Sequence, residues 1–212
     1  MEDEVLGKLL KAVPFEFHAS FKSQADEAIQ EVWERATRHR YTRQQFGMCL
    51  YPELERALLL AANDAGLKSS RQVTQPPGGS FAHVVADGFV IGRHSGAWPM
   101  SLPRRSGFRE RLAVLNSPID PQPQLFGEPQ IQSSAYYFSF LTVPDYRTGS
   151  GCAALALGAY TSDFQRWARY WTFEELKMAY VPEEVVSDEA APVEVPDAAR
   201  PQLKKPGSLN NG

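Results

Sequence analysis

The chain has 212 residues, of which 43% are hydrophobic, and its 22 Lys and Arg residues against 25 Asp and Glu residues give a formal net charge of −3. This length and apolar content suffice for one substantial hydrophobic core, whereas the negative charge argues against a general nucleic-acid coat protein, which would be strongly positive. The sequence contains no run of about 18 apolar residues that could cross a membrane, and its acidic start MEDEVLGKLL is unlike a secretory signal, so we expect the protein in the cytoplasm.

The two cysteines, Cys49 and Cys152, lie far apart in the sequence. Two thiols cannot form a disulfide framework or a four-cysteine zinc site. We therefore expect both to be reduced and buried, as free cysteines usually are.

The first third of the chain has the periodicity of three helices. Residues 2–13 form a short amphipathic helix that ends at Pro14, because proline lacks the amide proton that a helix needs. Residues 22–38 repeat apolar side chains at steps of three and four, which places them on one helix face. The third helix is expected to contain Pro52 in its first turn and to stop at Gly66.

Strands are predicted after the break at Pro76-Pro77-Gly78-Gly79. Residues 80–94 form a hairpin, because Asp87-Gly88 favours the positive φ angles of a two-residue turn. Residues 135–143 and 152–161 are predicted to be neighbouring strands. Both are apolar on both faces, which indicates central strands covered by helices.

Two later helices complete the predicted fold. SGFRERLAVLN, residues 106–116, is a helical patch within a segment rich in Pro and Gln. A last helix covers residues 173–180, and Thr172 with Glu175 forms its capping box.

The C-terminal residues differ in composition from the rest. Residues 181–212 contain five prolines, and 181–199 hold six acids and no base. Such a segment cannot bury enough apolar area to offset its ordering entropy, so we expect it to be disordered. The sequence therefore predicts a single α+β domain over residues 1–180, with N-terminal helices packed on a small, mainly antiparallel sheet, followed by a disordered, acidic, Pro-rich tail.

His83 and His94 both lie in the predicted hairpin. With Ala86 opposite Phe89, the two histidines share one face and lie diagonally across the strands. No Asp, Glu or Cys shares this face, and zinc takes three or four ligands. A structural role is therefore favoured over a catalytic or metal-binding pair.

The residue order Pro144-Asp145 followed by Glu175-x-Lys177 resembles that of the PD-(D/E)xK nucleases. The resemblance implies two acids that hold Mg²⁺ and a lysine that polarises the attacking water. That family's pattern requires the second acid and the lysine on the strand paired with the first acid's strand. The predicted partner strand, 152–161, has neither, and the helix cap accounts for Glu175. A metal-dependent nuclease using Asp145, Glu175 and Lys177 is the alternative hypothesis.

Two basic clusters stand out. RHRYTR, residues 38–43, lies at the end of the second helix, where cations favour the negative end of the helix dipole. PRRSGFRER, residues 103–111, surrounds a helix start, where the dipole favours acids instead. The forked donors of arginine suit phosphates or a partner's carboxylates. We call the second cluster the arginine patch, and its members are Arg104, Arg105, Arg109 and Arg111.

Two weaker patterns favour structural roles. TGSGC, residues 148–152, has the glycines of a phosphate-binding loop but no following Lys-Ser/Thr, so we expect a hairpin turn. The aromatic row Tyr136, Phe138 and Phe140 is expected in the core. Together the patterns favour a non-catalytic cytoplasmic interaction or regulatory protein without a cofactor. It would bind a protein or another anionic partner through the arginine patch, the tail, or both, and nucleic acid is not favoured.

Overall fold

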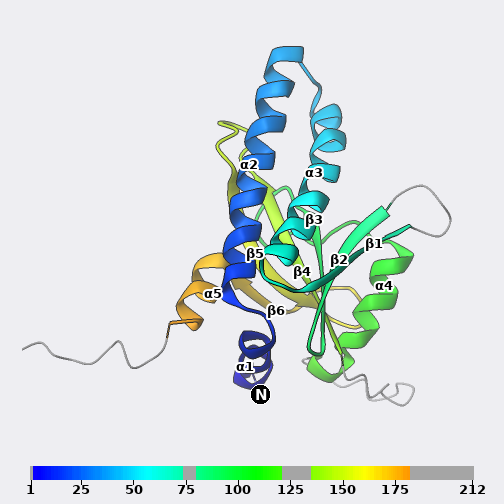
Figure 1. Cartoon of the computed structure of the whole chain (residues 1–212). Coiled ribbons are helices and arrows are strands. Elements are labelled where there is room, and N and C mark those ends of the chain that lie inside the picture. The colour runs from blue at the N-terminus through cyan, green and yellow to red at the C-terminus, as the bar shows by residue number, and fades with distance from the viewer. Residues whose placement is uncertain (1, 74–79, 121–134, 182–212) are drawn as a thin grey trace, which may run out of the picture. The chain divides into compact units, whose positions relative to one another are not determined.

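A computed structural model describes residues 2–73, 80–120 and 135–181 of the chain (Figure 1). The elements in these residues are, in chain order, α1 (Glu2–Ala12), α2 (Phe15–His39), α3 (Arg43–Asp64), β1 (Lys68–Val73), β2 (Ser80–Ala86), β3 (Phe89–Ser95), α4 (Gly107–Ala113), the 3₁₀ helix η1 (Val114–Ile119), β4 (Tyr136–Pro144), β5 (Cys152–Tyr160), β6 (Trp167–Thr172) and α5 (Phe173–Ala179).

The strands form one sheet in the order β1-β2-β3-β4-β5-β6, in which only the β3–β4 pair is parallel. The hairpin register is the predicted one, with Val84 opposite Ile91 and Ala86 opposite Phe89. The predicted neighbours β4 and β5 pair antiparallel. A parallel pair needs a long crossover, and the chain between β3 and β4 includes α4 and η1. The α+β class with a mainly antiparallel sheet is confirmed.

Helices cover both faces of the central strands. Helices α1, α2 and α3 pack on one face, and α2 and α3 lie side by side as a helical hairpin (Figure 1). Phe140 of β4 points into this main core, where its ring centroid is 4.4 Å from that of Phe21 in α2. Tyr137 and Tyr160 point to the other face and pack with Ala113 of α4. Most of the apolar residues on both faces of β4 and β5 are therefore buried, as the sequence predicts.

Two helix starts differ from the prediction. Helix α2 begins at Phe15, directly after Pro14, rather than at residue 22. Helix α3 begins at Arg43, because Thr42 and Gln45 form a capping box there. Pro52 therefore lies inside α3, and its assignment to the first turn is wrong. Its exposed position lets water satisfy the carbonyl that loses its helical partner.

The edge strands β1 and β6 were not expected from the sequence. All six residues of β1 are exposed, so KSSRQV shows no alternation between apolar and polar positions. WARYWT in β6 is half-buried along most of its length and likewise lacks a period of two. Edge strands need less apolar surface than central ones, which is why their sequence signal is weak.

The described residues through Tyr180 form one compact unit. Among the described helices, none is both long enough and apolar enough to cross a membrane. Both cysteines are free, as expected, but half-buried rather than buried. The predicted tail, 181–212, lies outside the described residues except for Val181.

Candidate functional site

The structure places the arginine patch around the start of α4. Arg104 and Arg105 precede the helix and are exposed, whereas Arg109 is half-buried and Arg111 is exposed again. The Arg109 guanidinium donates to the Arg104 carbonyl at 3.1 Å and lies 5.1 Å from the centre of the Phe108 ring. Arg109 thus braces the segment before the helix, while the other three arginines face solvent.

Most of the patch's charge has no partner in the described chain. Arg105 Nε lies 3.8 Å from Glu110 Oε1, and Arg105 Nη2 donates to the Asp163 carbonyl at 3.3 Å. Arg104 and Arg111 form no ion pair with any described carboxylate. Because an exposed pair such as that of Arg105 contributes at most about 1 kcal/mol, the patch keeps a positive potential.

A cavity of about 240 Å³ lies between α4 and strands β1 to β3, and we call it the α4 cavity. The Phe81 and Phe108 rings stack with centroids 4.0 Å apart and form part of its wall. Arg111 and His83 also line it, so the structure brings together one member of the patch and one hairpin histidine. The lining residues are Gln72, Phe81, His83, Val85, Val90, Phe108, Arg111 and Leu112.

His83 and His94 have separate partners. His83 Nε2 lies 3.1 Å from Ser70 Oγ of β1, and burial lowers the pKa of His83. His94 is 2% exposed, and its Nδ1 lies 2.8 Å from Tyr160 Oη and 3.1 Å from Ser139 Oγ. Burial lowers the pKa of His94 to about 3, so its ring is neutral near pH 7. The two histidines do not converge on one site, and the His94 ring stacks on the Trp167 ring of β6 with centroids 5.7 Å apart.

The two acids of the nuclease hypothesis are each engaged in local hydrogen bonds. Asp145 lies in the β4–β5 turn and accepts local hydrogen bonds there. These bonds lower the pKa of its carboxyl, and the bond from the Thr148 hydroxyl has the largest effect. Glu175 Oε2 accepts the Thr172 N–H at 2.7 Å in the predicted capping box, which lowers the pKa of Glu175. Lys177 is exposed on α5. The second acid thus lies on a helix and not on β5, and no three His, Cys, Asp or Glu residues of the described chain could hold a metal ion together.

An exposed apolar segment precedes the arginine patch and was not recognised in the sequence. Trp98 is 68% exposed, Met100 60% and Leu102 37%. The backbone of this segment is nevertheless held in place, because Trp167 Nε1 donates to the Met100 carbonyl at 2.9 Å and the Met100 N–H donates to Tyr170 Oη at 3.3 Å. The available signal was AWPMSLPRR, in which large apolar residues stand in a Pro-containing loop beside arginines.

A buried ion pair on the opposite face was also missed. Arg93 Nε donates to Glu55 Oε1 at 2.7 Å, with side chains that are 0% and 3% exposed. Glu55 also accepts the Ala82 N–H, and the Arg93 guanidinium lies 4.7 Å from the centre of the Tyr51 ring. Arg93 on an otherwise apolar strand face was the signal for such a partner, since a buried guanidinium needs a carboxylate. The pair joins α3 to the hairpin and is structural.

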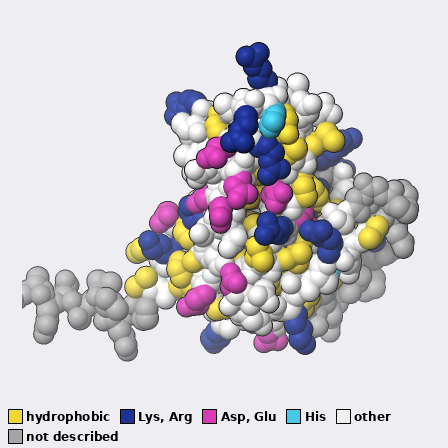
Figure 2. All heavy atoms as spheres, turned by 45° about the horizontal axis from the view of Figure 1, so that its top comes forward, with side chains coloured by type: hydrophobic (Ala, Val, Ile, Leu, Met, Phe, Trp, Pro, Cys, Tyr) yellow, Lys and Arg dark blue, Asp and Glu magenta, His cyan; other side chains and the backbone are white. Residues whose placement is uncertain are grey.

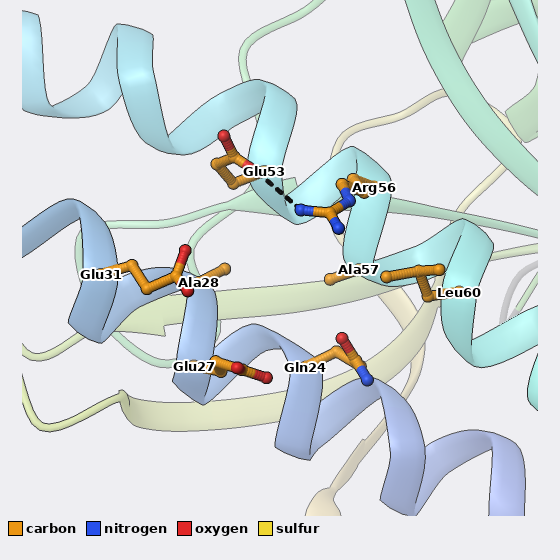
Figure 3. Close-up of a pocket in the computed structure, with 8 residues that line it drawn as sticks. All are labelled: Gln24, Glu27, Ala28, Glu31, Glu53, Arg56, Ala57 and Leu60. Atoms are coloured by element: carbon orange, nitrogen blue, oxygen red, sulfur yellow. Dashed lines mark ion pairs between the residues drawn. The ribbon is translucent and has the colours of Figure 1, made fainter.

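The surface between α2 and α3 is acidic. A pocket of about 110 Å³ lies there, and Figure 3 shows Glu27 and Glu31 on α2 beside Glu53 on α3. Arg56 Nη1 lies 3.8 Å from Glu53 Oε2 and offsets only one of these charges. An anionic partner is therefore not expected on this face.

Comparison of the chain with protein-family models, with curated proteins and with solved structures gives no match. Function is therefore inferred from the geometry of the residues described above.

Proposed function

We propose that this chain is a non-catalytic cytoplasmic interaction protein that binds an acidic segment of a protein partner at the surface formed by the arginine patch, the Trp98–Leu102 segment and the α4 cavity. One observation carries the proposal. Exposed Trp98 and Met100 lie shortly before Arg104, which, like Arg111, is exposed and has no carboxylate partner in the described chain. Trp, Met and Arg are the residues enriched at the centre of protein–protein interfaces.

The surface offers complementary places to a partner. The α4 cavity has the size and the aromatic wall to receive a partner's apolar side chain. Arg111 at the cavity and Arg104 before the helix would meet flanking carboxylates with forked donors. Gln72 of β1 also lines the cavity, and β1 is an edge strand among the described strands, so an extended partner segment would add to the sheet there through backbone hydrogen bonds. The tail 181–212 is a second proposed contact.

The test is capture of partners by the immobilised full-length chain at increasing salt, followed by affinity measurement with the purified partner. We expect Arg104→Ala/Arg111→Ala and Trp98→Ala each to weaken binding by about tenfold or more, as loss of a charge-assisted contact or an aromatic anchor does. Arg35→Ala, which removes one exposed charge on α2, is the matched control and should bind normally.

A partner whose affinity is unchanged by both patch variants and by deletion of 181–212 would contradict the proposal. So would binding that does not weaken with salt, because contacts between exposed charges are screened at high ionic strength. Loss of binding in Arg35→Ala as well would show that net charge, and not this surface, is responsible.

A further inference from the structure

A second cavity, of about 460 Å³, lies where α2 ends and α3 begins. The β4–β5 turn closes its third side through Tyr146. Figure 2, in which the top of Figure 1 comes forward, shows Lys and Arg side chains and a histidine beside hydrophobic side chains in the upper part of the view. The lining residues are Trp33, Ala36, Thr37, Arg40, Tyr41, Thr42, Arg43, Phe46 and Tyr146. We call this the α2–α3 cavity.

The aromatic side chains of this cavity are fixed by packing. The Phe46 ring meets the Trp33 and Tyr146 rings edge-on, with centroids 6.0 and 5.6 Å away. Gly149, with φ +68, holds the turn against Trp33 so closely that an added Cβ would lie 2.0 Å from the indole. Tyr41 is half-buried and stacks on His39 at 5.9 Å. The walls are therefore rigid aromatic surfaces formed before any ligand arrives.

Two arginines provide the charge. Arg43 Cζ lies 5.0 Å from the centre of the Tyr146 ring, and Arg40 lines the cavity beside it. No described carboxylate forms an ion pair with either arginine, and no acid lines the cavity. The negative end of the α2 dipole favours a cation at Arg40, but its backbone does not favour arginine, because Arg40 has φ 53, where Gly or Asn is usual. Arg43 is the first residue of α3, where the helix dipole disfavours a cation.

We propose that the α2–α3 cavity binds a free nucleoside monophosphate. Its flat base would stack on the aromatic walls, as bases do on Trp, Tyr and Phe side chains. Its phosphate would accept hydrogen bonds from Arg40 and Arg43, whose forked geometry suits phosphate oxygens. A volume of about 460 Å³ lies within the roughly 300–1,000 Å³ of small-molecule sites. An uncharged apolar ligand would make no use of the two guanidinium groups, and inorganic phosphate would use none of the aromatic walls.

The experiment is calorimetric titration of the full-length chain with AMP, GMP, CMP and UMP, with adenosine, inorganic phosphate and a single-stranded oligonucleotide as comparison ligands. We expect saturable binding of at least one monophosphate, with adenosine and inorganic phosphate each about tenfold weaker or more. Arg40→Asn/Arg43→Gln should weaken monophosphate binding by about tenfold or more. Asn tolerates the left-handed backbone at residue 40, and an unchanged circular dichroism spectrum would show that the variant folds.

Arg147→Gln is the matched control, because Arg147 is an exposed arginine in the same β4–β5 turn but does not line the cavity. The proposal would be overturned by no saturable binding of any monophosphate, by equal affinity in Arg40→Asn/Arg43→Gln, or by an equal loss in Arg147→Gln. Binding of the oligonucleotide without any monophosphate would also overturn it, since the ligand would then be a strand.

Discussion

The buried pair of Arg93 and Glu55 allows a sharp prediction about stability. Arg93→Met keeps an apolar side chain in the core but leaves the Glu55 carboxylate, which is 3% exposed, without its charged partner. Removing one member of a buried ion pair costs about 3–5 kcal/mol, because the remaining charge stays shielded from water. In a domain of this size each kcal/mol lowers Tm by about 2–4 °C. We therefore expect Tm to fall by about 6–20 °C.

Urea unfolding followed by tryptophan fluorescence would measure this change in the free energy of unfolding. Arg93→Met/Glu55→Leu removes both charges and should recover part of the loss, because the orphaned charge is gone. Recovery should be incomplete, since the Ala82 N–H then loses its acceptor at a cost of about 1–3 kcal/mol. Arg56→Met is the matched control: its side chain is 69% exposed and its pair with Glu53 is long, so we expect a loss of at most about 1 kcal/mol.

The reasoning would be refuted if Arg93→Met lost no more stability than Arg56→Met. That result would mean that the Glu55 carboxylate is not held as an isolated buried charge once Arg93 is removed. Additive losses in the double variant would likewise show that the two side chains are not energetically coupled.

Three further predictions concern acid stability, the β4–β5 turn and metal ions. Burial lowers the pKa of His18 to about 4 and that of His94 to about 3, below the ordinary 6.5, so the unfolded chain binds more protons and stability falls as pH drops from 7 to 5. Each histidine contributes about 2 kcal/mol to this loss. The free energy of unfolding of His94→Gln, measured at pH 7 and pH 5, should therefore show about half of the decrease that His18 and His94 together cause. Gly149→Ala should lower the free energy of unfolding by about 2–4 kcal/mol, because the strain of a positive φ and the clash with the Trp33 indole add together. Gly66→Ala is the control, since Gly66 has a similar φ but open space around it, and it should cost only about 1 kcal/mol in the same thermal assay. Equal losses would mean that the indole contact is unimportant. Calorimetric titration with Mg²⁺ should give the same result for the original chain and for Asp145→Ala, with no saturable site at Asp145. A saturable Mg²⁺ site that is lost in Asp145→Ala would restore the nuclease hypothesis.

Local chemistry made much of the fold predictable. Asp87-Gly88 sets both the turn and the register of the β2–β3 hairpin, because only a few residues accept its backbone angles. Thr172 and Glu175 mark the start of α5 through their reciprocal hydrogen bonds. The same motif at Thr42 and Gln45 starts α3 but was overlooked in favour of Pro52. Helix starts thus depend on which of two competing local signals is stronger.

Contacts between distant segments could not be predicted in the same way. The β1 strand pairs through its backbone, and its exposed side chains carry no burial pattern. The arginine patch was visible as a run of charges, but its meeting with His83 in the α4 cavity depends on how α4 packs across the sheet. The α2–α3 cavity similarly needs Tyr146, which lies about a hundred residues beyond the helices that it faces. The spacing of residues in the sequence does not predict such tertiary contacts.

The net charge of the chain is a poor guide to what its two proposed binding surfaces bind. The chain is negative overall, yet each proposed binding surface combines arginines that form no described ion pair with aromatic or apolar side chains. Glu27, Glu31 and Glu53 line a different pocket, midway along α2 and α3. Because exposed charges act over only about 8 Å at physiological salt, an anion at either surface interacts mainly with the nearby arginines and little with distant acids. Binding at both surfaces should therefore weaken as salt rises, whereas docking through apolar contact alone would not. Salt dependence thus distinguishes recognition of an anion from simple hydrophobic association at each surface.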